Sequence, residues 1–589
     1  MMKKMFSCER NVQMLVYLLK AHNIKKVIVS PGTTNCNFVY SLMSDDFFEL
    51  HSSIDERSAA YAACGMAYES GEPVVITCTG ATASRNYFPG LTEAYHRKLP
   101  VLAVTATQDN SNCGNLSPQY IDRSEQPKET VRLSVHLQNV KDDTDAWDCN
   151  VKINRALLEL RRNGGGPVHI NLSTAYNNRT VDRLPETRVI RRFLRGEALP
   201  KIPETAAKIA VTIGAHRAFR EEEQQKLDLF CEKTNAVVFC DHSSGYHGKY
   251  GVNPSIVAAQ PVKSAIFDID LLIHLGEEHA DYYTNAELMR AKEVWRVSPD
   301  GEVRDTFRKL TAVFEMSEAE FFASYYENGV VFSDMSYFKE CRKEKIEIMQ
   351  QLPELPFSNL YAASVTMPLL PAGSIVQLGV SNTMRSWTFF DFPEGVSSVA
   401  NTGCRGIDGT LSALLGMSLA SPERLHFCVL GDLTFFYDMN ALGNREVGKN
   451  LRILLVNNGI GAEFRLYQHR AYQILQDDIR PYVAAGGHYG NRSPGLVKDY
   501  ATDLGFEYLC ASNQGELAQA LPVFTDPEMR EKPVLLELFT DAKAESDALY
   551  AIRNIRKDPH AESKKAVKKL AGAVLGENGF RLLKKVLKK

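Results

Sequence analysis

Two short apolar runs in the C-terminal half of the chain, each followed by an oxygen-bearing side chain, restrict the fold more than any other feature. The run His426–Leu430 ends just before Asp432, and the run Ile453–Val456 ends just before Asn458. Apolar runs of this length between turn residues predict buried strands. Strands of an open parallel sheet end at a common edge, where such sheets bind their ligands. We therefore expect Asp432 and Asn458 to lie side by side in an α/β domain.

The chemistry of this segment indicates an anionic ligand carried on a metal ion. Asp432 and Asn458 are hard oxygen donors without a nearby His or Cys, which suits magnesium or calcium better than zinc. A helical pattern begins at Gly431-Asp432, and the amides of residues 431–434 would face a phosphate group. We expect a diphosphate bound through a divalent cation. The alternative is that both segments are ordinary turns, because Asp-Gly and Asn-Gly pairs usually are.

The length of 589 residues exceeds what one hydrophobic core supports and suits roughly three or four domains. Short apolar runs alternate with helical patterns, which predicts parallel sheets with helices on both faces. The expected strands are Lys26–Val29, His51–Asp55, Val74–Cys78, Val101–Thr105, Val168–Leu172, Ile209–Ile213, Ala236–Phe239, Leu271–Leu275, Val294–Val297, Ile375–Leu378, His426–Leu430, Ile453–Val456 and Val534–Leu538. The predicted fold class is α/β, with three Rossmann-like parallel-sheet domains at 1–180, 204–330 and 361–545, a helical connector at 331–360 and a basic helical tail at 546–589.

Two segments outside the first and third domains carry no expected ligand. The polar, Arg-rich stretch 177–203 is predicted to be a linker. The turn Gly214–Arg217 in the central domain lacks the GxGxxG spacing of nucleotide-binding loops, so we expect that domain to be structural.

Composition narrows the function further. A net charge of −3 gives no global attraction for nucleic acid, and the N-terminus lacks the apolar run of a signal peptide. Twelve cysteines without a CxxC pair predict reduced thiols, so we expect a cytoplasmic protein. Residues 551–589 carry twelve Lys or Arg against three Asp or Glu. This tail is expected to bind anionic lipid or an acidic partner, or to be a solvated helix packed on the third domain.

A carboxylate in the first domain stands at a second strand-to-helix junction. Glu56 begins a helical pattern and is followed by small residues at 59–67, which allow a helix to pack closely. A glutamate at a helix N-terminus is also common for electrostatic reasons alone. The segment Thr77–Asn86, with the sequence TCTGATASRN, begins at the end of the next expected strand, Val74–Cys78.

Together these segments resemble the thiamine diphosphate (ThDP) dependent enzymes over nearly the whole chain, up to about residue 540. Gly431-Asp432, 24 intervening residues and Asn457-Asn458 are similar to the diphosphate and magnesium motif of that family, with Leu433 in place of the usual Gly. The segment around Glu56 resembles the family's pyrimidine-binding segment, and Thr77–Asn86 resembles its TSGxxxxN loop. The resemblance implies ThDP and Mg²⁺ as cofactors, with a pyrimidine-binding, a central and a diphosphate-binding domain.

The resemblance also implies roles for individual residues. Glu56 would activate the cofactor by sharing a proton with its pyrimidine ring, Asp432, Asn458 and the carbonyl of Ile460 would bind the metal, and Ile407 would prop the cofactor in a bent shape. Ile407 could equally be an ordinary apolar residue at a helix start. Gln119 and His51 are further catalytic candidates. The expected cofactor-binding residues are Glu56, Thr79, Gly80, Asn382, Thr383, Arg405, Gly406, Ile407, Gly431, Asp432, Leu433, Thr434, Asn458, Ile460 and Gly461.

Within the family, the segments GIDG, GDLTFFYD and NNGIGAEF most resemble the SEPHCHC synthases of menaquinone biosynthesis. Three arginines that would hold substrate carboxylates there are replaced here, by Thr34, Gln108 and Thr402. Threonine and glutamine do not reproduce a bidentate arginine contact. The cations that could serve a different substrate are Arg385, Arg405, Arg465, His469 and Arg470.

We expect a ThDP- and Mg²⁺-dependent transferase or lyase that decarboxylates a 2-oxo acid and passes the acyl carbanion to an acceptor. Residues 105–115 contain no His pair of the kind that simple decarboxylases carry, which favours transfer over release as an aldehyde. The alternatives are a non-transferring decarboxylase, a SEPHCHC synthase with a rebuilt substrate site, or an inactive scaffold that recruits partners through its tail. Since the family joins Glu56 and the metal site across subunits, a homodimer or homotetramer is implied.

Overall fold

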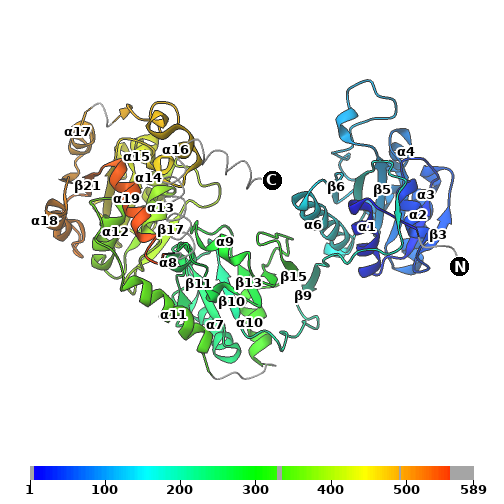
Figure 1. Cartoon of the computed structure of the whole chain (residues 1–589), viewed down its shortest axis with the longest axis horizontal. Coiled ribbons are helices and arrows are strands. Elements are labelled where there is room, and N and C mark those ends of the chain that lie inside the picture. The colour runs from blue at the N-terminus through cyan, green and yellow to red at the C-terminus, as the bar shows by residue number, and fades with distance from the viewer. Residues whose placement is uncertain (1–4, 328–333, 490–492, 558–589) are drawn as a thin grey trace, which may run out of the picture. The chain divides into compact units, whose positions relative to one another are not determined.

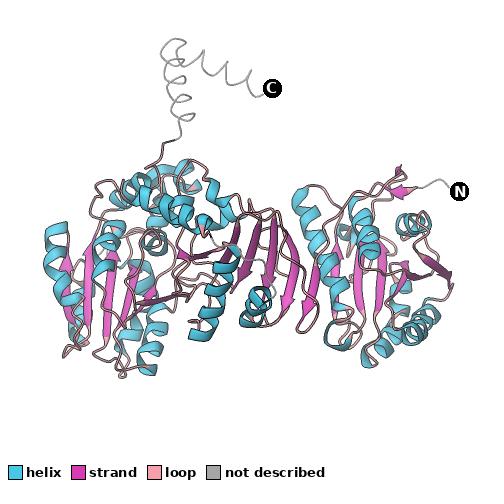
Figure 2. Cartoon of the chain, turned by 90° about the horizontal axis from the view of Figure 1, so that it is seen from below, coloured by secondary structure: helices cyan, strands magenta, loops and turns pink. Residues whose placement is uncertain are grey.

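The computed structural model describes residues 5–327, 334–489 and 493–557 (Figure 1). It divides into two compact units, one made of residues 1–199 and 299–315 and the other of residues 200–298 and 316–589. In both units parallel strands lie between layers of helices (Figure 2). The predicted α/β fold class with parallel-sheet domains is therefore confirmed. The predicted amphipathic tail helix lies outside the described residues.

Unit 1 is built on a parallel sheet with the strand order β3-β2-β4-β5-β7-β6. Its strands are β2 (Lys26–Val29), β3 (Glu49–Ser52), β4 (Val74–Thr79), β5 (Val101–Thr107), β6 (Leu133–Leu137) and β7 (Val168–Ser173). Its helices are α1 (Arg10–Ala21), α2 (Cys36–Met43), α3 (Glu56–Ser70), α4 (Thr82–Asn86), α5 (Phe88–His96) and α6 (Asp143–Glu159). Four short strands complete the unit, namely β1 (Phe6–Ser7), β8 (Thr180–Val181), β9 (Arg191–Leu194) and β15 (Leu310–Glu315).

The central strands of unit 1 are apolar on both faces because helices cover both faces. Val75 and Leu102 pack into a cluster with α1, α2 and α6, whereas Val74, Ile76 and Val101 pack into another with α3 and α5. Successive side chains of a strand point to opposite faces, so a strand buried on both sides has an uninterrupted apolar sequence. This is why β2, β4, β5 and β7 were predictable as apolar runs.

Unit 2 contains parallel strands in the orders β12-β11-β10-β13-β14 and β17-β16-β18-β19-β21-β20. The first set is β10 (Ile209–Ile213), β11 (Val237–Cys240), β12 (Gly251–Val252), β13 (Leu271–Leu275) and β14 (Glu293–Val297), with α7 (Glu221–Thr234), α8 (Ser255–Ala258), α9 (Thr284–Leu288), α10 (Glu318–Glu327) and α11 (Ser336–Met349). The second set is β16 (Ile375–Leu378), β17 (Ser397–Ala400), β18 (His426–Gly431), β19 (Leu451–Asn457), β20 (Glu507–Ala511) and β21 (Val534–Phe539), with α12 (Asn359–Thr366), α13 (Asn382–Trp387), α14 (Thr410–Ala420), α15 (Asp432–Asp438), α16 (Arg470–Leu475), α17 (Leu496–Asp503), α18 (Gln514–Phe524) and α19 (Ala542–Ile552).

Two sequence-based expectations need correction. The strand expected at His51–Asp55 is β3, which ends at Ser52, because the Asp55 side chain instead caps α3 by accepting a hydrogen bond from the amide of Ser58 at 2.7 Å. The stretch 177–203 is not a plain linker, since it contains β8 and β9, and β9 pairs in parallel with β15. Strand pairing uses backbone groups, so a polar segment beside a partner strand can form it.

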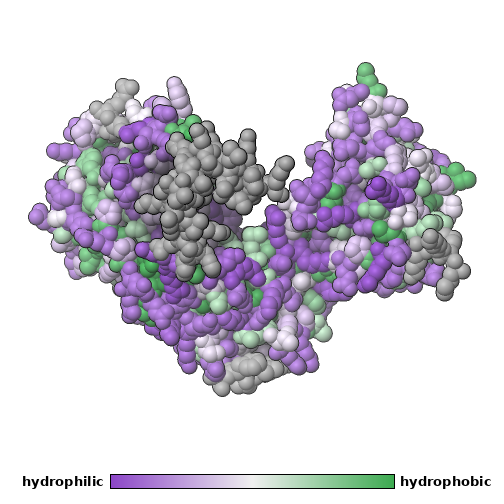
Figure 3. All heavy atoms as spheres, in the orientation of Figure 1, coloured by the Kyte–Doolittle hydropathy of each residue, from purple (hydrophilic) through white to green (hydrophobic). Residues whose placement is uncertain are grey.

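The surface visible in Figure 3 is largely hydrophilic. Among the described residues, no helix combines the length and apolar character needed to cross a bilayer.

Candidate cofactor site

A pocket of about 160 Å³ lies in unit 2 where β16, β18 and β19 reach their carboxyl ends. Strands β18 and β19 pair with Gly431 opposite Val456, so the residues that follow each strand come together as the sequence predicted. The residues that line the pocket and were expected to bind cofactor are Asn382, Thr383, Ile407, Gly431, Asp432, Leu433, Thr434, Asn458, Ile460 and Gly461. Arg405 and Gly406, which were also expected there, are not among its lining residues.

Asp432 is the first residue of α15 and is 5% exposed. Its Oδ1 accepts a hydrogen bond from the amide of Leu433 and its Oδ2 accepts one from the amide of Gly459, both at 3.0 Å. Burial nevertheless raises the pKa of Asp432 to about 7. A cation beside the carboxylate would oppose this shift, because it favours the charged form.

The two asparagines after β19 have different surroundings. Asn458 lines the pocket, and its Oδ1 accepts a hydrogen bond from the amide of Ile460 at 3.3 Å. Asn457 instead donates through Nδ2 to Oε1 of the buried Glu537 on β21 at 2.7 Å. Gly459 follows with a φ of +75°, a conformation that glycine adopts without strain. The turn thus brings the side chain of Asn458 to the pocket, while Asn457 is hydrogen-bonded within the sheet.

The donor set of the pocket fits a hard cation that is shared with a ligand. Among the described residues no group of three or more His, Cys, Asp or Glu could hold a metal ion by itself. The pocket offers one carboxylate, one amide oxygen and backbone carbonyls, and magnesium typically completes such a partial set with oxygens of a bound phosphate and water. The space beside Gly431 is open, since no atom lies within 4 Å of the position that a Cβ would take.

The opposite wall of the pocket is the start of α13. Ser381, just before this helix, has a φ of +70°, a conformation that is strained for a residue with a side chain. Asn382 donates through Nδ2 to Glu545 at 3.2 Å, while its Oδ1 is buried and has no hydrogen-bond partner among the described residues. Burial raises the pKa of Glu545. An orphaned acceptor here indicates a wall that a ligand or water completes.

Two of the five candidate cations lie together beside this pocket. The guanidinium groups of Arg385 and Arg405 lie 4.0 and 4.6 Å from the ring centroid of Tyr282. Arg385 also donates to Glu463, a lining residue, at 2.7 Å. None of the five candidates, which also include Arg465, His469 and Arg470, is itself a lining residue.

The second half of the predicted site lies in unit 1. Glu56 is the first residue of α3 and is half-buried, and Asn86 donates from Nδ2 to its Oε2 at 3.1 Å. The small residues that follow do allow close packing, since a Cβ added to Gly90 would lie 2.5 Å from the Cβ of Ala60. The fold thus joins the two segments that carried the pyrimidine-site prediction.

Sequence reasoning missed a buried arginine in this half. Arg123 is 2% exposed and donates from Nε and Nη2 to Oδ1 of Asn171 at 3.1 and 2.8 Å, while its Nη1 is buried and has no partner among the described residues. Gly80 makes room for it, since a Cβ there would lie 2.2 Å from Nη1. The only signal in the sequence was an arginine four residues after Gln119.

The remaining predicted residues of unit 1 are more peripheral. Gln119 and His51 are exposed, the first in a loop with a φ of +70° and the second on the edge strand β3. Thr79 is half-buried at the end of β4. Thr34, at one of the substituted arginine positions, donates its hydroxyl to the carbonyl of Ala106 at 2.6 Å.

The chain is similar in sequence to known proteins. The model of the thiamine pyrophosphate enzyme N-terminal TPP binding domain matches residues 10–126. A 2-succinyl-5-enolpyruvyl-6-hydroxy-3-cyclohexene-1-carboxylate (SEPHCHC) synthase of Bacteroides fragilis is 31% identical over 574 residues, which cover 93% of this chain and 100% of that protein. Synthases of the same name from Bacteroides thetaiotaomicron and Porphyromonas gingivalis are 31% and 25% identical, each covering 92% of this chain and 98% of its own length.

Proposed function

Since this chain belongs to the family of thiamine diphosphate-dependent enzymes, we propose that it decarboxylates a 2-oxo acid and transfers the acyl unit to a second carbon substrate. ThDP and Mg²⁺ are the proposed cofactors. The observation that carries the proposal is the pocket where Asp432, Asn458 and the first amides of α15 meet, because this donor set suits a diphosphate on a divalent cation.

In this proposal the residues of unit 2 hold the diphosphate end. Asp432, Asn458 and the carbonyl of Ile460 bind Mg²⁺, which keeps the buried carboxylate ionised. Ile407 supports the cofactor from the pocket wall. When bound, ThDP supplies a nucleophilic carbon for attack on the 2-oxo group and an electron sink for the loss of carbon dioxide.

Glu56 is the proposed activator. Its carboxylate would share a proton with the pyrimidine nitrogen of the cofactor, and the hydrogen bond from Asn86 fixes its orientation. The hydrogen bond from Asn86 goes to Oε2 of Glu56. We therefore assign the shared proton to the other oxygen, Oε1.

The substrate charges are proposed to meet a set of arginines different from that of the similar synthases. Arg385 and Arg405 lie beside the diphosphate pocket, and Arg123 places a buried guanidinium beside Gly80. Three sites where those synthases are expected to carry arginine have none here, which favours a different donor and acceptor. The identity of 31% over most of the chain favours a second candidate, a SEPHCHC synthase with a rebuilt substrate site.

Carbon dioxide release from a panel of 2-oxo acids, with and without candidate acceptors, tests the proposal. Wild-type protein with ThDP and Mg²⁺ should release carbon dioxide from at least one acid, and an acceptor should divert the product from aldehyde to a ligation product. Glu56→Gln should still bind ThDP, as followed by circular dichroism, but lose at least about a hundredfold in rate.

Each failure has a separate meaning. Aldehyde as the sole product with every acceptor would favour the non-transferring decarboxylase. Activity confined to 2-oxoglutarate with isochorismate would favour the SEPHCHC synthase. Absence of ThDP binding by the wild type would favour the inactive scaffold.

A further inference from the structure

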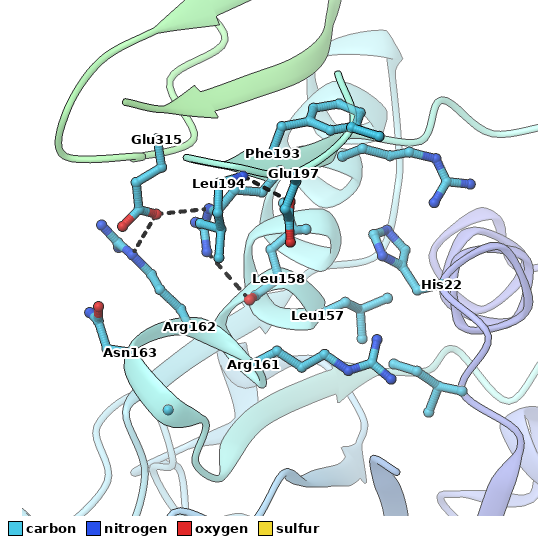
Figure 4. A pocket seen from close by; sticks show the side chains of 15 residues that line it. His22, Leu157, Leu158, Arg161, Arg162, Asn163, Phe193, Leu194, Glu197 and Glu315 are labelled. Atoms are coloured by element: carbon cyan, nitrogen blue, oxygen red, sulfur yellow. Dashed lines mark hydrogen bonds and ion pairs between the residues drawn. The ribbon is translucent and has the colours of Figure 1, made fainter. Parts of the chain in front are cut away.

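A second and larger pocket, of about 670 Å³, lies in unit 1 (Figure 4). Its residues His22 and Ile24 precede β2, and Arg161–Gly164 precede β7, so it lies at the edge where these strands begin. Glu56 and Gly80 follow β3 and β4 at the opposite edge. These strands have four to six residues and therefore span about 13–20 Å. The pocket is therefore separate from the proposed cofactor site, and its volume is in the range of small-molecule sites.

One side of this pocket is electrostatically satisfied. Arg162 pairs with Glu302 at 2.7 Å and with Glu315 at 3.4 Å, and Arg192 lies 3.6 Å from the same Glu315. In Figure 4 the Arg162 side chain points toward Glu315, and a dashed line joins the two. The charges of Arg162 and Arg192 are therefore neutralised by carboxylates of the protein, without a ligand.

On the other side, two arginine side chains form no ion pair within the described residues. Arg161 and Arg191 line the pocket and are exposed, and their side chains make no hydrogen bond or ion pair within the described residues. Figure 4 places the Arg161 guanidinium on the side of His22, away from Arg162. Burial lowers the pKa of His22, and the charges of Arg191 and Arg161 lower it further. Both arginines therefore lie close enough to His22 to act on it, and both line the same cavity, where an anion would be attracted to them.

The surroundings of these cations are apolar rather than purely aqueous. Leu158 and Phe193 are half-buried lining residues, and Leu194 is 43% exposed. Glu197 is the one lining carboxylate besides Glu315, and its Oε2 accepts a hydrogen bond from the amide of Leu194 at 2.8 Å. The lining therefore combines a net positive charge with an apolar wall.

We propose that this pocket is a ligand site for a small organic oxyanion, distinct from the cofactor and substrate site. The carboxylate or phosphate head lies between Arg161 and Arg191, which provide charge-assisted hydrogen bonds. The apolar body packs on Leu158, Phe193 and Leu194. An anion without such a body lacks half of these interactions.

Calorimetric titration of the full chain saturated with ThDP and Mg²⁺ tests the site, with benzoate, phenyl phosphate and inorganic phosphate as probes. At least one of the two aromatic anions should bind, at least about tenfold more tightly than inorganic phosphate, and the better of the two identifies the head group. Arg161→Gln or Arg191→Gln should weaken binding at least about tenfold. Glu197→Gln should strengthen it, because a like charge is removed.

Two variants serve as controls. Arg179→Gln removes an exposed arginine of unit 1 that is not a lining residue, and it should leave the affinity unchanged. Glu56→Gln should also leave it unchanged, so the result is independent of the proposed catalytic function. The proposal is overturned if neither aromatic anion binds, if inorganic phosphate binds equally well, or if Arg179→Gln weakens binding as much as Arg161→Gln.

Discussion

Neighbouring residues of the same type have different roles in this protein. Asn457 and Asn458 are adjacent, yet Asn457 is hydrogen-bonded to the buried Glu537 and Asn458 lines the pocket. Because successive residues at a strand end point in different directions, one serves the fold and the other is available to a ligand. At the residue scale, the role of a side chain therefore depends on whether it points into the sheet or toward the pocket.

Substituting the two asparagines separately tests this division. Asn458→Ala should raise the Mg²⁺ concentration for half-maximal activity at least about tenfold, because a metal ligand is lost. Asn457→Ala should leave that concentration unchanged but destabilise the protein by about 1–3 kcal/mol, because Glu537 loses a buried donor. Activity titrated with Mg²⁺ and the midpoint of thermal unfolding are the measurements. Equal Mg²⁺ dependence of both variants would contradict the assignment.

Arg123 is the second residue whose role can be separated. Burying a guanidinium with one nitrogen unpartnered costs free energy, and the carboxylate of a substrate is the charge that we expect to offset this cost. Arg123→Gln should raise the KM for the 2-oxo acid about tenfold or more with ThDP affinity unchanged. Steady-state kinetics and ThDP titration by circular dichroism are the measurements. A general loss of structure would instead lower both the rate and the affinity for ThDP.

At the scale of elements, α3 determines where the carboxylate of Glu56, the proposed activator, lies. The helix begins at Glu56 because Asp55 caps it, and it packs against α5 through Ala59, Ala60 and Ala63. The absence of a side chain at Gly90 makes this approach possible. The position of Glu56 is therefore fixed by packing along the whole helix rather than by its own contacts.

Gly90→Ala tests the packing of this element. The added Cβ meets the Ala60 side chain and backbone, so the variant should lose about 1–3 kcal/mol of stability and part of its activity. Gly65→Ala on α3 is the matched control, because no atom lies within 4 Å of its Cβ position, and it should be neutral or slightly stabilising. Thermal unfolding midpoints compare the two. A stable Gly90→Ala protein with full activity would refute the packing argument.

At the scale of the whole molecule, Glu56 and Asp432 belong to different compact units. We propose that the active form is a homodimer or larger assembly in which Glu56 of one copy serves the metal pocket of another. Neither Glu56→Gln nor Asp432→Ala should then be active alone. Mixed and allowed to exchange subunits, they should recover about a quarter of the wild-type rate, since half of the dimers are mixed and carry one intact site. No recovery would place both residues in one copy.

The sequence by itself determined the buried parallel strands and the sheet edge where Asp432 and Asn458 line a pocket. Strands such as β10 and β16 were predicted with their observed bounds, because burial on both faces demands a continuous apolar run that is visible without neighbours. Asp432 and Asn458 were predicted to meet for the same reason, since each directly follows such a strand. The local sequence pattern was sufficient to predict a strand, and the position of the residue after it, wherever that strand is buried on both faces.

Only the tertiary structure decided the features that depend on partners distant in sequence. Strand β9 has the sequence RRFL and becomes a strand because β15 lies beside it, and β17 is formed from SSVA beside β16. Arg123 becomes buried through Asn171, 48 residues away. Backbone pairing and the burial of a charge depend on which segments the fold brings together. The composition of one segment does not indicate which other segment will lie beside it.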